Sequence, residues 1–144
     1  MLTEEDRAIY EWQLDVAGFG EEGQEKLRNT TALVSRIGGL GGPIAFALAA
    51  AGIGKLILAH AGNLRKDDLN RQILMQWEGL GKPRVESAAK TLAAFNPKVD
   101  IEIHNENLSK NNAAALVSKA DIVFSSAPLF EERFLMNQEC VRQN

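Results

Sequence analysis

A cluster of glycines between an apolar strand and an apolar helix most limits how this 144-residue chain can fold. The short apolar run Thr31–Ser35 leads into the sequence RIGGLG at 36–41, and Gly41–Ala51 is rich in alanine and leucine. Glycines let a backbone approach a phosphate closely, and a helix N-terminus offers unpaired N–H groups and the positive end of a dipole. The pattern therefore predicts an α/β architecture of the nucleotide-binding kind.

The rest of the chain alternates between strand-like and helix-like segments. The first thirty residues are polar and helical in pattern, and 61–81 is irregular with a helical hint at 69–75. Further elements are predicted from apolar spacing, from Pro83 at a helix start and from Ser109 as an N-cap. They are strands at 55–59, 99–103 and 121–125 and helices at 83–95, 109–118 and 129–142. Parallel strands joined by right-handed crossovers follow, so we expect a Rossmann-like three-layer sandwich with a mainly parallel sheet, preceded by N-terminal helices.

Composition narrows the class of protein. The length suits a single domain spanning 1–144, and 45% hydrophobic with 24% charged residues is ordinary for a folded protein. The net charge of −3, with scattered Lys and Arg, argues against nucleic acid as a partner. The longest apolar stretch, 43–53, is too short to span a bilayer. A single cysteine, Cys140, allows no internal disulfide and no four-cysteine zinc site, and fits a reducing, cytoplasmic location.

Two positions argue against a simple dinucleotide-binding loop. Arg36 stands where the pattern G-x-G-x-x-G has its first glycine, and His60 stands at the end of the second predicted strand. Dinucleotide enzymes usually carry a carboxylate at that strand end to hold the ribose hydroxyls. A neutral imidazole is a poor bidentate ribose ligand, so a NAD-dependent dehydrogenase becomes a minor alternative.

Several further motifs are linked to the glycine loop at fixed spacing. Tyr10 and Gln13 precede it with GQE at 23–25, and the motifs after it are AGIG at 51–54, DDLNRQ at 67–72 and GKPRVES at 81–87. In these motifs the chain resembles the ThiF/MoeB/HesA family, bacterial relatives of ubiquitin-activating enzymes, over nearly its whole length. The resemblance implies binding of ATP and Mg²⁺, and adenylation of the C-terminal glycine carboxylate of a ubiquitin-like or sulfur-carrier protein. It also implies a homodimer.

The resemblance assigns site residues by position. Arg71 corresponds to the arginine of the family's L-x-R-Q motif, and Arg84 stands where the family has lysine, so both are predicted to act in catalysis. The residues predicted to hold the nucleotide are Gly38, Gly39, Gly41, His60, Asp68, Arg71, Gln72 and Arg84. No residue is predicted to ligate a metal.

The chain departs from the family pattern at positions that contact ATP and magnesium. The family's opening segment R-Y-x-R-Q carries an arginine that reaches the triphosphate of a neighbouring subunit, and this chain reads Ile9-Tyr10-Glu11-Trp12-Gln13 there. Two strand-end acids, an asparagine and an Asp-Asn pair of the family are replaced by His60, Gly62, Asp68 and Pro128-Leu129 respectively. Proline and leucine side chains offer no oxygen to magnesium. Losing one transition-state contact typically lowers an enzyme's rate by ~10²–10³.

Three hypotheses follow, and whether the chain is an enzyme stays open. The first is a catalytically impaired family member that serves as a dimerisation or carrier-protein-binding partner, in a homodimer or with a related subunit. The second is an active ATP-dependent adenylyltransferase with a rebuilt site. The third is a Rossmann domain for another anionic ligand, held by Arg36, Arg71 and Arg84. Family members generally run well past the length of this chain, so it is either a fragment or a half-domain.

Overall fold

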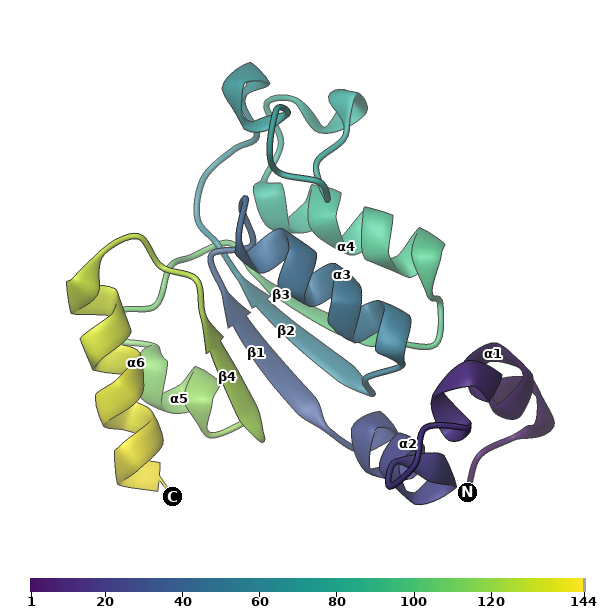
Figure 1. Cartoon of the computed structure of the whole chain (residues 1–144). Helices are drawn as coiled ribbons and strands as arrows, with labels where there is room; N and C mark the ends of the chain where they lie inside the picture. Colours follow the sequence, from purple (N-terminus) through teal and green to yellow (C-terminus); the bar gives the residue numbers. More distant parts are fainter. Residues whose placement is uncertain (144) are drawn as a thin grey trace.

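A four-stranded parallel sheet organises the molecule, as the computed structural model shows for residues 1–143 (Figure 1). The strands are β1 (Thr31–Ser35), β2 (Lys55–Ala59), β3 (Asp100–His104) and β4 (Ile122–Ser125), in the order β3-β2-β1-β4. In the register, Leu33 of β1 pairs with Ile57 of β2 on one side and Val123 of β4 on the other. The predicted Rossmann-like α/β fold is confirmed.

Helices cover both faces of the sheet, which makes the three layers (Figure 1). On one face, α3 (Gly41–Ala51) and α4 (Arg84–Phe95) pack on alternate strand residues such as Val34 and Leu58. On the other face, α5 (Ala113–Val117) and α6 (Phe130–Gln143) pack on the intervening residues, which include Leu33 and Ile57. The central strands β1 and β2 are therefore buried on both faces, as expected for a parallel sheet. Within residues 1–143, no helix has both the length and the apolar character that crossing a membrane requires.

The N-terminal helices α1 (Glu4–Leu14) and α2 (Gly20–Arg28) lie at the amino ends of the strands, at the lower right of Figure 1. The chain reverses between them at Gly18 and Gly20, whose φ values of 81° and 57° are in the left-handed region that glycine adopts without strain. The predicted helical N-terminus is thus two helices separated by a glycine turn.

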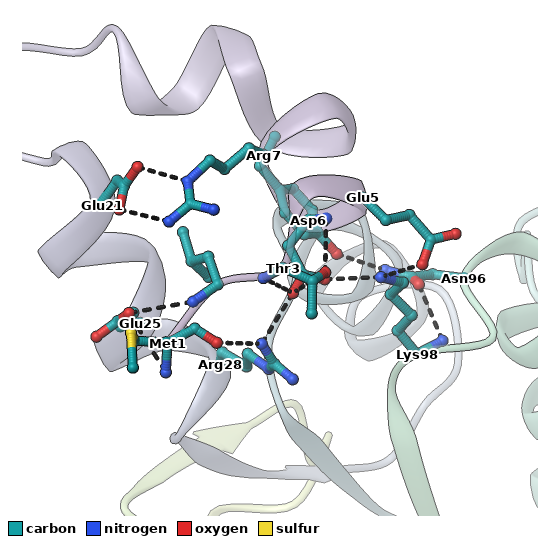
Figure 2. A network of polar contacts seen from close by, with 12 residues as sticks. Met1, Thr3, Glu5, Asp6, Arg7, Glu21, Glu25, Arg28, Asn96 and Lys98 are labelled. Carbon is teal, nitrogen blue, oxygen red and sulfur yellow. Dashed lines mark hydrogen bonds and ion pairs between the residues drawn. The ribbon is translucent and has the colours of Figure 1, made fainter.

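A buried carboxylate ties these helices to the sheet (Figure 2). The Asp6 carboxylate accepts hydrogen bonds from Lys98 Nζ at 2.7 Å, Arg28 Nη1 at 2.8 Å and Thr3 Oγ1 at 2.8 Å. The hydrogen bond from Lys98, followed by those from Thr3, holds the pKa of Asp6 well below its usual range. Lys98 precedes β3 and Arg28 ends α2, so Asp6 joins three separate segments of the chain.

Two predicted helical segments differ in the structure. Residues 110–112 form a turn and α5 starts at Ala113, although Ser109 makes capping contacts: its Oγ accepts from the Asn111 N–H, and its N–H donates to Asn112 Oδ1 at 2.8 Å. The helical hint at 69–75 is also wrong, since the long loop at the top of Figure 1 contains only two 3-10 turns, Lys66–Asp68 and Trp77–Gly79. Side chains compete there for backbone donors, and Asp68 accepts from the Arg65 N–H at 3.0 Å.

Candidate nucleotide site

The glycine loop lies at the carboxyl end of β1 and leads directly into α3. A Cβ atom on Gly41 would lie 2.5 Å from the Arg36 carbonyl oxygen, so this position requires glycine. The N–H groups of Gly39 and Leu40 donate to no protein acceptor within residues 1–143, and both residues are exposed. The loop therefore presents free N–H groups at the positive end of the α3 dipole, which is the arrangement that favours an anion.

Arg36 is the only non-glycine residue with positive φ among residues 1–143, at 60°. A left-handed conformation costs a non-glycine residue about 1 kcal/mol or more. Its guanidinium donates to Glu132 Oε2 of α6 from Nε at 2.9 Å and from Nη2 at 2.8 Å. The Glu132 side chain is only 6% exposed, so this pair neutralises Arg36 and fixes the glycine loop to α6. Sequence reasoning missed Glu132 because the partners are 96 residues apart.

Asp68 brings together two of the other predicted site residues. Arg84 donates to Asp68 Oδ2 from Nε at 3.0 Å and from Nη2 at 2.8 Å. Gln72 Nε2 donates to the other carboxylate oxygen, Oδ1, at 2.7 Å. The side chains of Arg84 and Asp68 are 14% and 6% exposed, so the pair is largely withdrawn from water. The positive charge of Arg84 is thus already compensated inside the protein.

Arg71 differs from the other two arginines because its side chain is 56% exposed. It donates from Nη1 to the Asp67 carbonyl oxygen at 2.6 Å, and Nη2 lies 3.5 Å from Asp68 Oδ1. A Cβ atom on Gly39 would lie 3.3 Å from Arg71 Cγ, so the side chain runs beside the loop. Arg71 is therefore the predicted cation best placed to meet a ligand from solvent.

His60 follows β2 at the same edge of the sheet, as predicted. Burial, followed by the nearby positive charges of Arg84 and Arg36, lowers the pKa of His60 to about 4. The imidazole is accordingly neutral at pH 7. Its Nδ1 is buried and makes no hydrogen bond within residues 1–143.

The neutral state of His60 makes stability depend on pH. Because the folded-state pKa of about 4 lies below the ordinary 6.5, protonation favours the unfolded chain. The stabilisation is complete above the ordinary pKa and is lost as the pH falls toward the folded-state value. We expect the free energy of unfolding to decline between about pH 7 and pH 5, and His60→Gln to flatten that decline. Urea titrations at several pH values measure the free energy of unfolding of the wild type and of His60→Gln. If that free energy falls equally with pH in both proteins, His60 is not the group responsible.

The side chains at this edge do not fit a magnesium site. Among residues 1–143 no group of three or more His, Cys, Asp or Glu side chains is arranged to hold a metal ion. Pro128 and Leu129 follow β4 where the resemblance implies Asp-Asn, and they lack the side-chain oxygens that Mg²⁺ requires. The nearest carboxylates, Asp68 and Glu132, are each paired with an arginine.

The parallel sheet, the glycine loop and the free N–H groups at α3 together define a Rossmann-like domain with a nucleotide-type site. Residues 10–144 match the ThiF family, and the chain belongs to that family. The heterocyst protein HesA of Trichormus variabilis is 45% identical over 141 residues, which are 98% of this chain and 53% of that protein. The adenylyltransferase and sulfurtransferase MOCS3 of Drosophila sechellia is 36% identical over 99% of this chain and 32% of its own length.

Solved structures share the fold. The E. coli tRNA N6-threonylcarbamoyladenosine dehydratase TcdA, in complex with AMP, superposes with a TM-score of 0.90 over 99% of this chain and 57% of that one. At 22% identity this likeness shows the fold alone. The chain spans about half the length of the HesA protein that it matches.

Proposed function

We propose that this ThiF-family domain is impaired in ATP-dependent adenylyl transfer and serves as a dimerisation or carrier-protein-binding partner. The observation that carries the proposal is that two arginines of the site, Arg36 and Arg84, are each paired with a buried carboxylate. Arg36 is held by Glu132 and Arg84 by Asp68, each through two guanidinium nitrogens and a carboxylate that is 6% exposed.

Adenylyl transfer depends on cations placed around developing negative charge. To reach Arg36 or Arg84, a triphosphate would have to displace a buried carboxylate. Breaking a buried pair leaves an uncompensated charge, at a cost of about 3–5 kcal/mol. The displaced Asp68 or Glu132 would also lie close to the phosphates and repel them. Arg71 alone stays exposed, and one exposed cation gains little in water.

Exposed apolar side chains support the partner role. On α6, Leu135 and Met136 pack against the core, whereas Phe130 and Phe134 are 70% and 62% exposed. The two exposed rings stack on each other with centroids 6.1 Å apart. Trp12 on α1 is 86% exposed. Large exposed aromatic side chains are typical of surfaces that bind another protein.

The second candidate is an active adenylyltransferase that activates the C-terminal carboxylate of a ubiquitin-like or sulfur-carrier protein. The free N–H groups of Gly39 and Leu40 and the exposed Arg71 favour it. So does the name of MOCS3, an adenylyltransferase. The third hypothesis, another anionic ligand held by Arg36, Arg71 and Arg84, is weakened because two of these three arginines are already paired.

Calorimetric titration with ATP, with and without Mg²⁺, tests the proposal, with TcdA, a protein solved in complex with ATP, as the positive control. We expect TcdA to bind and this protein to show no magnesium-dependent affinity for ATP. Sedimentation in the same buffer is expected to give a species heavier than the 15.7 kDa chain. Tight magnesium-dependent binding, or pyrophosphate exchange with a carrier protein, would show that the second candidate is correct.

A further inference from the structure

Arg36, the first residue of the glycine loop, has a backbone conformation that is unfavourable for its side chain. Its φ of 60° lies in the left-handed region, which costs an arginine about 1 kcal/mol or more and a glycine nothing comparable. Residues in such conformations persist where the surrounding structure holds them, and they cluster at switches and binding sites. The group that holds Arg36 is Glu132 of α6, which accepts from two of its guanidinium nitrogens.

This pair keeps the charge of Arg36 from the loop to which the residue belongs. The Arg36 carbonyl oxygen accepts from the Gly38 N–H at 2.7 Å, so the side chain starts within the loop itself. The guanidinium nevertheless reaches the first turn of α6, where Glu132 neutralises it. An anion at the free N–H groups of Gly39 and Leu40 therefore meets no available charge from Arg36.

Arg36 cannot leave the pair unless Glu132 also changes its surroundings. The Glu132 side chain is 6% exposed, and a buried carboxylate without its partner is strongly unfavourable. Release of Arg36 therefore requires the start of α6 to move, so that Glu132 reaches water. Arg133, the next residue, holds that start in place, because its Nε donates to the Ala127 carbonyl oxygen at 2.6 Å. On the outer side of the turn, Phe130 is 70% exposed and leaves room for movement.

We propose that the Arg36–Glu132 pair is an autoinhibitory latch on the glycine loop. In the closed state seen here, Glu132 takes the charge of Arg36 and the loop offers an anion its N–H groups alone. When the first turn of α6 moves outward, Arg36 is released and its guanidinium turns to a phosphate-type anion at the loop. The inference rests on the proposed function, in which paired arginines oppose ATP binding, and adds that this pair is reversible.

Calorimetric titration with inorganic pyrophosphate, without magnesium, tests the latch. We expect Glu132→Gln to bind pyrophosphate at least about tenfold more tightly than the wild type, the effect of one hydrogen bond between charged groups. Glu131→Gln is the matched control, because it removes the same charge one residue earlier from an exposed side chain, and it should bind like the wild type. The double variant Arg36→Gln/Glu132→Gln should lose the gain, since the gain comes from Arg36.

Arg133→Met tests the part that α6 plays. The substitution breaks the hydrogen bond to Ala127 and also removes a positive charge. Loss of charge alone would weaken pyrophosphate binding, whereas release of the latch should strengthen it by about threefold, the contribution of one neutral hydrogen bond. Weaker binding by Arg133→Met would overturn the role of α6.

Glu132→Asp keeps the test decisive if Glu132→Gln does not fold. It retains the buried charge but shortens its reach, so it should also bind pyrophosphate more tightly than the wild type. The latch would be overturned by no gain in the folded Glu132 variant, by an equal gain in Glu131→Gln, or by a gain that survives the loss of Arg36. Each of these results would leave the proposed function standing. Tight magnesium-dependent binding of ATP by the wild type would overturn both.

Discussion

Replacing Gly54 by alanine is expected to lower the free energy of unfolding by about 3 kcal/mol or more. A Cβ atom at this position would lie 1.8 Å from the Arg28 carbonyl oxygen, closer than any two such atoms can approach. The neighbouring backbone is held in place, because the Gly54 N–H donates to Leu27 O and the Gly54 carbonyl accepts from the Asp100 N–H. The obstacle is main chain, so no side-chain rotation relieves it, and either α2 or the start of β2 must move.

Urea unfolding of Gly54→Ala beside Gly38→Ala measures this effect. Gly38 is the matched control, because a Cβ there would meet nothing closer than 3.5 Å, an ordinary contact with the Gln72 side chain. For a domain of this size the expected loss corresponds to a melting temperature lower by about 10 °C. Equal stabilities of the two variants would show that α2 is not packed against the start of β2 as described.

Replacing Arg84 by glutamine is expected to lower the free energy of unfolding by about 3–5 kcal/mol. The substitution removes a charge but keeps a side chain of similar length. It leaves the Asp68 carboxylate, which is 6% exposed, without the two guanidinium hydrogen bonds that it now accepts. Arg71 Nη2, 3.5 Å from Asp68, compensates only in part because its side chain is mostly in water. Adding Asp68→Asn to the variant should recover much of the loss, since the buried charge then disappears.

Arg65→Gln is the matched control for Arg84→Gln. Arg65 pairs with Asp67 in the same loop, but the two side chains are 70% and 61% exposed, so this change should cost less than about 1 kcal/mol. A double-mutant cycle on Arg84 and Asp68, measured by urea unfolding, isolates the coupling between them. Similar losses in Arg65→Gln and Arg84→Gln would mean that the Asp68–Arg84 pair is solvated and that Arg84 is free to bind an anion.

The strand and helix layout was largely accessible from the sequence. Apolar runs at β1, β2 and β4 and alternation at β3 are local patterns, and a glycine turn between a strand and a helix requires no distant partner to be recognised. The failures were also local in kind. The helix expected from Ser109 begins only at Ala113, and the loop after β2 contains 3-10 turns in place of the helical segment expected at 69–75.

The candidate site likewise has some features that the sequence predicts and others that only the structure shows. Gly38, Gly41 and His60 follow β1 and β2 at the carboxyl edge of the sheet, because the carboxyl ends of parallel strands meet there. Arg84, at the start of α4, is held near them by Asp68. Whether those side chains were available to a ligand could not be read from the motifs. An arginine in a loop has the same local pattern whether its charge faces solvent or a buried carboxylate.

By itself, the sequence determined the α/β fold, the glycine loop at the start of α3 and the set of polar residues that surrounds it. These follow from periodicity and from conformational demands that each residue carries locally. Only the tertiary structure decided that Arg36 meets Glu132, 96 residues away, and that Arg84 is paired with the buried carboxylate of Asp68. The physical reason is that pairing of charges and hydrogen bonds depends on distances across elements, which exist only once the chain has packed.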